Sequence, residues 1–183
     1  MAATATTQPS ILDRAIRAAK LDRAVYEEVE ADRTATTQAA TVVAVSSILA
    51  GIGATEGALS QAITTTITAL VAWAAYAWIA YYVGTRLIPD PGTKADWGEV
   101  ARTLGFASAP RAVGVLGVVP GLGVLAVAVA GLWTLVATVV AVQAALDVRT
   151  GKAIGIAVVS YVGLALVQYV VVSLALGGGV TPF

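Results

Sequence analysis

Four long runs of the sequence contain no charged residue, and they constrain the fold more than any other feature. They cover residues 34–55, 63–85, 112–146 and 153–176. A helix needs about 20 mainly apolar residues to cross the roughly 30 Å hydrocarbon core of a membrane. The chain is 58% hydrophobic and 12% charged, whereas soluble domains usually have about 25% charged residues. The sequence therefore predicts an all-α, polytopic membrane protein.

The third run decides how often the chain crosses the membrane. Its 35 residues would form a helix of about 52 Å, far longer than one crossing requires. Pro120 and Gly121 lie within this run, and a Pro-Gly pair favours a turn over a continuous helix. We therefore expect a short third crossing over residues 106–119 and a fourth over 122–146. The chain then crosses five times.

The distribution of charge predicts the orientation. With five crossings and a cytoplasmic N-terminus, all 11 Lys and Arg residues lie on the inner side, as the positive-inside rule favours. With four crossings, Arg149 and Lys152 would lie outside. The first ten residues have neither a basic start nor an apolar run, so no cleavable signal peptide is predicted. We expect a cell-membrane protein with a cytoplasmic segment at residues 1–33, a five-helix domain at 34–176 and an outer tail at 177–183, with Glu56 also outside.

Two stretches outside the crossings have the pattern of amphipathic helices. The first starts at Ser10, with Asp13 in a capping position, and its apolar positions Leu12, Ala15, Ile16 and Ala19 lie opposite Asp13, Arg14, Arg17 and Lys20. We expect this helix on the inner leaflet. Its apolar stripe continues through Leu21, Val25 and Val29, which would let it run into the first crossing. The second is a short interfacial helix before the third crossing, capped by Asp96 with Glu99, and its apolar face is Trp97, Val100, Ala101 and Leu104.

Seven charged residues and one tryptophan near the inner surface are the candidates for binding lipid or protein partners. They are Glu27, Glu30, Asp32, Arg86, Asp96, Trp97, Arg102 and Arg111. The acidic cluster at residues 27–32 could pair with arginines or hold a hard cation, but a solvated face is the favoured interpretation. Arg111 lies five positions into the short third crossing, so it either snorkels to the inner headgroups or marks a tilted or re-entrant segment.

Polar residues within the crossings form a second set of candidates. They are Gln38, Thr41, Tyr161 and Gln168, and hydrogen bonding between helices is favoured over a solute path. Gly105, Pro110 and Pro120 are expected to be structural.

The chain contains no Cys and no His. Disulfides, thiolate or imidazole metal sites and His-based catalysis are therefore excluded. No catalytic residues, cofactor or metal are predicted. The net charge is zero and no short basic cluster occurs, so nucleic-acid binding is not expected either.

Three stretches of the sequence together have the pattern of a known family. They are the acidic-to-polar entry YEEVEADRTATTQAATVV, the Gly105 to Pro110 motif GFASAP followed by Pro120, and WTLVATVVAVQAALDVRTGKAI. In these stretches the sequence resembles the Ypt-interacting-protein (Yip) domain family, in a compact, Ala- and Val-rich form typical of its prokaryotic members. The resemblance extends over residues 21–176. It implies a five-helix, non-enzymatic membrane protein, and its eukaryotic members act in vesicle traffic with Rab-type GTPases. This chain lacks their Asp-Leu-Tyr-Gly-Pro element and has Ala107 where the family has Ser, so Rab binding is not predicted.

The leading hypothesis is a membrane scaffold, organiser or trafficking-type adaptor. It would bind membrane lipids, further copies of itself or other membrane proteins at its cytoplasmic face. The alternative is a channel or carrier for a small solute or ion, which the intramembrane polar residues and Arg111 would line. A carboxylate metalloenzyme using Glu30, Asp32 and Asp96 is the third.

Overall fold

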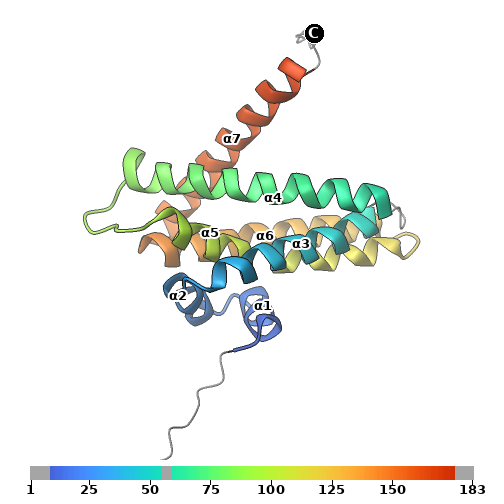
Figure 1. The fold of residues 1–183 in the computed structure, drawn as a ribbon, viewed down its shortest axis with the longest axis horizontal. Helices are drawn as coiled ribbons and strands as arrows, with labels where there is room; N and C mark the ends of the chain where they lie inside the picture. The colour runs from blue at the N-terminus through green and yellow to red at the C-terminus, as the bar shows by residue number, and fades with distance from the viewer. Residues whose placement is uncertain (1–8, 55–58, 176–183) are drawn as a thin grey trace, which may run out of the picture.

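The computed structural model describes residues 9–54 and 59–175, and these residues form seven α-helices, a π-helical turn and a 3₁₀ helix, without a β-strand (Figure 1). In chain order they are α1 (Ile11–Ala19), α2 (Arg23–Ala31), α3 (Ala35–Ala54), α4 (Leu59–Tyr82), the π-turn η1 (Val83–Leu87), α5 (Trp97–Phe106), the 3₁₀ helix η2 (Ala109–Val118), α6 (Gly123–Leu146) and α7 (Thr150–Ala175). The predicted all-helical class is confirmed. The predicted outer tail and Glu56 lie outside the described residues.

Four helical segments in the described part of the chain are long and apolar enough to cross a membrane. They are Ala35–Ala54, Gln61–Leu87, Gly123–Leu146 and Thr150–Leu174. Each corresponds to one of the uncharged runs, with the third run represented by its second half. In Figure 1, α3, α4 and α6 run side by side as a bundle, α1 and α2 pack across one side of it, and α7 leaves it obliquely.

The predicted turn at Pro120 is present. Gly121 adopts a left-handed conformation with φ of +83°, and the Leu122 amide donates to the Val119 carbonyl at 3.0 Å. The segment before the turn differs from the prediction, because residues 109–118 form a 3₁₀ helix and not an α-helix. At about 2.0 Å per residue, its ten residues extend about 20 Å.

Close glycine contacts with α3 account for the 3₁₀ geometry. A 3₁₀ helix has three residues per turn, so Gly114 and Gly117 share one face. A Cβ atom on Gly114 would lie 3.1 Å from Cα of Ala50, and one on Gly117 would lie 2.6 Å from the carbonyl oxygen of Gly53. These contacts bring η2 directly against the α3 backbone and require glycine.

Gly105 continues the same line of contacts in α5. A Cβ atom there would lie 2.6 Å from Cβ of Ala39. The partners of Gly105, Gly114 and Gly117 follow the same order along α3, namely Ala39, Ala50 and Gly53. The segments α5 and η2 therefore run parallel to α3. Together the two segments extend about 35 Å. Pro110 is buried at the start of η2, and Pro120 is exposed in the turn.

The second predicted amphipathic helix is present as α5, but its surroundings differ from the expectation. Asp96 accepts from the Glu99 amide at 2.9 Å, and the Glu99 carboxylate accepts from the Asp96 amide at 2.8 Å, which completes the predicted capping box. Every residue from 100 to 108 is buried, and the Trp73 indole donates to the Ala101 carbonyl at 2.9 Å. The helix is therefore enclosed by α2, α3, α4 and α6 and does not expose one face.

Candidate functional site

The N-terminal helices α1 and α2 are two separate elements joined by a sharp turn. Leu21 has a φ of +63°, and the Asp22 side chain then caps α2 by accepting from the Ala24 amide at 3.0 Å. The expectation that the first helix runs on into the first crossing is wrong, because this left-handed residue reverses the chain. The Tyr26 hydroxyl donates to the Ala18 carbonyl at 3.0 Å, and it holds the two helices together.

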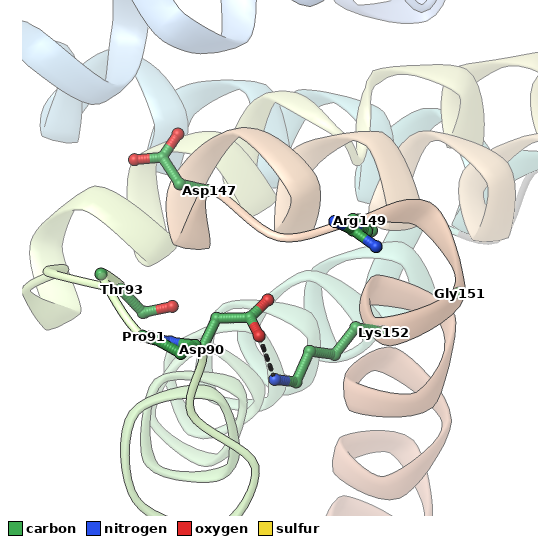
Figure 2. Close-up of a pocket in the computed structure, with 8 residues that line it drawn as sticks. Asp90, Pro91, Thr93, Asp147, Arg149, Gly151 and Lys152 are labelled. Atoms are coloured by element: carbon green, nitrogen blue, oxygen red, sulfur yellow. Dashed lines mark hydrogen bonds and ion pairs between the residues drawn. The ribbon is translucent and has the colours of Figure 1, made fainter.

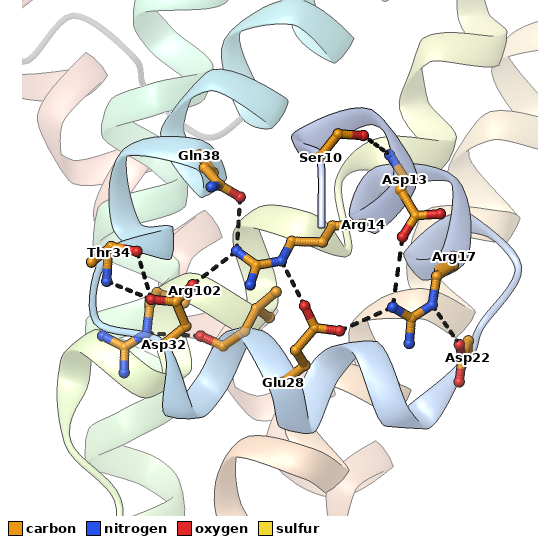
Figure 3. Close-up of polar contacts among 11 residues, drawn as sticks. Ser10, Asp13, Arg14, Arg17, Asp22, Glu28, Asp32, Thr34, Gln38 and Arg102 are labelled. Atoms are coloured by element: carbon orange, nitrogen blue, oxygen red, sulfur yellow. Dashed lines mark hydrogen bonds and ion pairs between the residues drawn. The ribbon is translucent and has the colours of Figure 1, made fainter. Parts of the chain in front are cut away.

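Arg14 lies at the centre of the contacts between these helices and the bundle (Figure 3). Its side chain is only 2% exposed, and it makes ion pairs with Glu28 at 2.8 Å and Asp32 at 2.9 Å. It also donates to the Gln38 side chain on α3 at 3.0 Å. Burial works to lower the pKa of Arg14, but the hydrogen bonds and charges of the two carboxylates together raise it. Arg14 therefore stays charged and joins α1, α2 and α3.

Arg17 extends this network toward the surface (Figure 3). It pairs with Asp22 and Glu28, each at 2.9 Å, and with Asp13 at 3.7 Å. Hydrogen bonding to Arg17 lowers the pKa of Asp22. Glu28 thus lies between two arginines, so Glu28 and Asp32 are paired and do not belong to a solvated face, which was the favoured interpretation for the whole acidic cluster.

The C-terminal end of α2 is fixed by Arg102 on α5. The Arg102 side chain is 5% exposed, and its Nε donates to the carbonyl oxygens of Val29 at 3.0 Å and Glu30 at 3.2 Å. These carbonyls belong to the last turn of α2, where the helix dipole favours a positive charge. Just beyond it, Asp32 accepts from the Thr34 hydroxyl at 2.6 Å. That hydrogen bond, together with Arg14, lowers the pKa of Asp32.

The environment of Glu30 favours the neutral form of its carboxyl group. Burial, together with the negative charges of Asp147, Glu99 and Glu27, raises the pKa of Glu30 to about 7, although Arg102 opposes the shift. Glu27 is exposed and has no hydrogen-bond or ion-pair partner among the described residues. No group of three or more acidic residues in the described part of the chain could hold a metal ion.

Two large apolar residues of α1 face away from the rest of the protein. Leu12 is 67% exposed and Ile16 is 46% exposed, whereas Arg14 and Ala18 on the other side are buried. The indole of Trp133, in the middle of α6, donates to the Ala19 carbonyl at 2.7 Å. The helix therefore docks through Arg14 and Ala18, with Ile11 and Ala15 packed beside them, and leaves Leu12 and Ile16 exposed.

A second polar feature lies where the loop before α5 meets the start of α7 (Figure 2). Its surface hollow has a volume of about 810 Å³, and it is lined by Asp90, Pro91, Gly92, Thr93, Asp147, Arg149, Gly151 and Lys152. The Lys152 ammonium group pairs with Asp90 at 2.7 Å and donates to the Pro89 carbonyl at 2.9 Å. The Thr93 hydroxyl donates to the Leu146 carbonyl at 3.1 Å. These contacts fix the loop to the end of α6 and the start of α7.

Three further predicted surface residues lie outside the ion-pair network of α1 and α2. Arg86 is exposed at the end of η1, and Trp97 is 39% exposed at the start of α5. Arg111 is half-buried on η2, and its guanidinium donates to the Ser47 hydroxyl on α3 at 3.3 Å.

The predicted intramembrane polar residues are not brought together along one path. The Gln38 side chain accepts a hydrogen bond from Arg14, and the Thr41 hydroxyl donates to the Thr37 carbonyl one turn earlier at 2.9 Å. Tyr161 and Gln168 are exposed on α7, which packs on α4 and α6.

The sequence reasoning did not identify three specific partners in the ion-pair network of α1 and α2, namely Arg14, Arg17 and Glu28. A signal for them exists, because Arg14 and Arg17 are three positions apart, Glu28 and Asp32 are four apart, and each pair shares a face of its helix. Two consecutive short helices with complementary charged faces predict an ion-paired hairpin. Nothing in the local sequence indicates the Trp133 contact, which joins residues far apart in the chain.

Comparison with known proteins gives one match. The model of the family described as the Yip1 domain matches residues 27–172, within the range over which the sequence showed its resemblance. No curated protein and no solved structure matches the chain significantly.

Proposed function

The chain belongs to the Yip1 domain family, and from this premise we propose that it is a non-catalytic, trafficking-type membrane scaffold. In this proposal it crosses the cell membrane five times, with the N-terminus in the cytoplasm, and contacts the inner leaflet through α1. The lipid contact is an apolar one at the boundary between headgroups and acyl chains, and other membrane proteins are recruited at the same face.

One observation carries the proposal, namely the orientation of α1. A helix docked on a soluble protein normally turns its apolar stripe inward. Here Arg14 is buried and paired, while Leu12 and Ile16 point outward. Exposed apolar residues in this position suit the boundary between headgroups and acyl chains, where amphipathic helices bury one apolar face.

The five crossings are supported by the path of α5 and η2. These segments run parallel to α3, extend about 35 Å together and end at the Pro120 turn. A segment of that length, continuous from one end of α3 to the other, suits a full crossing. Its pairing with α3 through glycine supplies the close contact that helices in membranes use.

Cysteine labelling tests the number of crossings, because the chain has no native Cys. Val119→Cys and Thr150→Cys are both at exposed positions. With five crossings, a membrane-impermeant maleimide added to intact cells labels Val119→Cys only. Labelling of Thr150→Cys alone would show either that η2 turns back without crossing or that the chain is inserted the other way round, and both would refute this topology.

Depth-dependent quenching tests the contact between α1 and lipid. We would attach a polarity-sensitive fluorophore at Ile16→Cys in the full chain and reconstitute it into vesicles with doxyl-labelled lipids. The matched control is Glu27→Cys on the exposed side of α2. The proposal expects shallow-doxyl quenching at position 16 well above that at position 27. Equal, weak quenching at both positions would contradict lipid contact by α1.

A further inference from the structure

The C-terminal half of α7 has no packing partner within the described chain. In Figure 1 this helix leaves the bundle obliquely. Its first half packs on α4, where the Tyr76 hydroxyl donates to the Ala157 carbonyl at 3.0 Å and Gly163 approaches Ile79. Beyond Gly163, Leu166, Val170 and Val171 are each more than half exposed.

Lipid alone can cover the exposed apolar residues, but the polar side chain of Gln168 also needs a hydrogen-bond partner. Its side chain is exposed on α7, and its amide has no hydrogen-bond partner among the described residues. The flanking residues are apolar, and Gln168 lies about 10 Å before Ala175, within a helix long enough to span. An amide in hydrocarbon is unfavourable unless it finds a donor and an acceptor.

Gln168 belongs to a stripe with heptad spacing. Alternating steps of four and three residues connect Ile154, Val158, Tyr161, Ala165, Gln168 and Val172, and all six are exposed. This spacing is the signature of a left-handed helix pair. The stripe unites Gln168 with Tyr161, whose hydroxyl also has no partner among the described residues, and it places the small residue Ala165 between them.

We infer that α7 pairs with α7 of a second copy of this chain through this stripe. Copies inserted in the same orientation are related by a two-fold axis along the membrane normal, so each residue meets its own counterpart at the same depth. An amide both donates and accepts, which makes Gln168 self-complementary. Two Gln168 side chains form reciprocal hydrogen bonds, and a polar residue at such a position also fixes the register of the pair.

The packing on α4 leaves room for this partner. The buried residues of the first half of α7 are Ala153, Ile156, Ala157 and Ser160, and at 100° per residue they lie on the side adjoining the stripe and not on it. A second α7 can therefore dock without displacing α4. The inference rests on the proposed membrane crossing of α7, but not on lipid binding by α1.

Disulfide cross-linking in the full chain tests the pair. Single cysteines at Ala165 and Val172 lie on the stripe, and those at Leu166 and Val170 lie on the far side of the helix at matched depths. In proteoliposomes at low protein-to-lipid ratio, copper phenanthroline is expected to produce dimers from the first two variants and not from the second two. Equal cross-linking at all four positions, or monomer throughout, would overturn the inference and leave the stripe facing lipid.

A second measurement isolates Gln168. Fluorescence energy transfer between labelled copies in vesicles gives the dimerisation constant of the wild type, Gln168→Leu and Gln168→Asn. Gln168→Leu is expected to weaken dimerisation about 3- to 30-fold, as for other hydrogen bonds between membrane helices, and Gln168→Asn is expected to retain most of it. An unchanged constant in Gln168→Leu would refute the role of the amide. Fluorescence quenching at Ile16→Cys is independent of this result, so the inference and the proposed function can fail separately.

Discussion

Replacing Arg14 or Arg17 by Met separates the effect of burial from the number of ion pairs. Arg17 makes three ion pairs and is 30% exposed, whereas Arg14 makes two and is 2% exposed. If the number of pairs decided stability, Arg17→Met would be the more damaging change. We expect the opposite. Met keeps much of the apolar stem of either arginine, so the comparison isolates the charged head.

The expected magnitudes follow from the exposure of each group. The pairs of Arg17 are screened by water and contribute about 1 kcal/mol together. Removing one member of a buried pair costs about 3–5 kcal/mol. After Arg14→Met, however, Glu28 keeps Arg17 and Asp32 keeps Thr34. We therefore expect Arg14→Met to destabilise the docking of α1 by about 2–3 kcal/mol.

Hydrogen exchange measures this docking directly. In detergent-solubilised protein under conditions where reclosing outpaces exchange, a loss of about 2 kcal/mol speeds exchange of the α1 amides about 30-fold, and a loss of about 1 kcal/mol about fivefold. Amides in the middle of α6 are the internal control and should stay unchanged. If Arg17→Met accelerated exchange as much as Arg14→Met, burial would not decide the strength of this network and the reasoning would be wrong.

The remaining predictions concern packing, capping and pH. Gly53→Ala is expected to lower the stability to thermal unfolding by about 2 kcal/mol or more, because the new Cβ would lie 1.9 Å from the Gly114 carbonyl oxygen. The control is Gly131→Ala, whose new Cβ meets nothing within 4 Å and which should be neutral or slightly stabilising. Equal effects of the two substitutions would contradict the close packing. Asp96→Ala removes the cap of α5 and should cost about 1 kcal/mol, seen as roughly fivefold faster exchange in its first turn; unchanged exchange would show that the capping box contributes nothing. The pKa of Glu30 is raised from 4.5 to about 7, so the folded state holds its proton more tightly. The stability that this proton contributes is complete below pH 4.5 and is lost as pH rises to 7, a loss of about 1–2 kcal/mol in denaturant titrations after the shift is discounted for a partly exposed side chain. Glu30→Gln should flatten this profile and Glu27→Gln should not; parallel profiles in Glu30→Gln and the wild type would disprove the assignment.

Local sequence signals were sufficient where one short segment determines its own conformation. Ser10 accepts from the Asp13 amide at 3.1 Å at the start of α1, Asp96 caps α5, and the chain turns at Pro120. In each case the side chain or ring that acts on the backbone lies within three residues of its effect. The long uncharged runs likewise predicted the apolar helices, because hydrophobicity over some 20 residues is a local property.

The errors occur where distant segments compete for the same surface. Helical periodicity indicated that α1 has an apolar and a charged side, but not which side meets the protein. Glu28 and Asp32 decide this, because they offer Arg14 two carboxylates from the next helix. The burial of α5 and the 3₁₀ form of η2 arise in the same way, since both depend on close contact with α3 through Gly105, Gly114 and Gly117.

The arginines of α1 form ion pairs within the protein, and this limits how α1 can bind a membrane. Arg14 and Arg17 are already neutralised by acidic partners, so they contribute little attraction to anionic headgroups. The affinity of α1 for lipid must then come mainly from Leu12 and Ile16, whose burial is favoured by about 25 cal/mol per Å² of apolar surface. An apolar contact of this kind is insensitive to salt, whereas attraction to anionic lipid is screened by it. Membrane contact through α1 should therefore depend on apolar area more than on lipid charge.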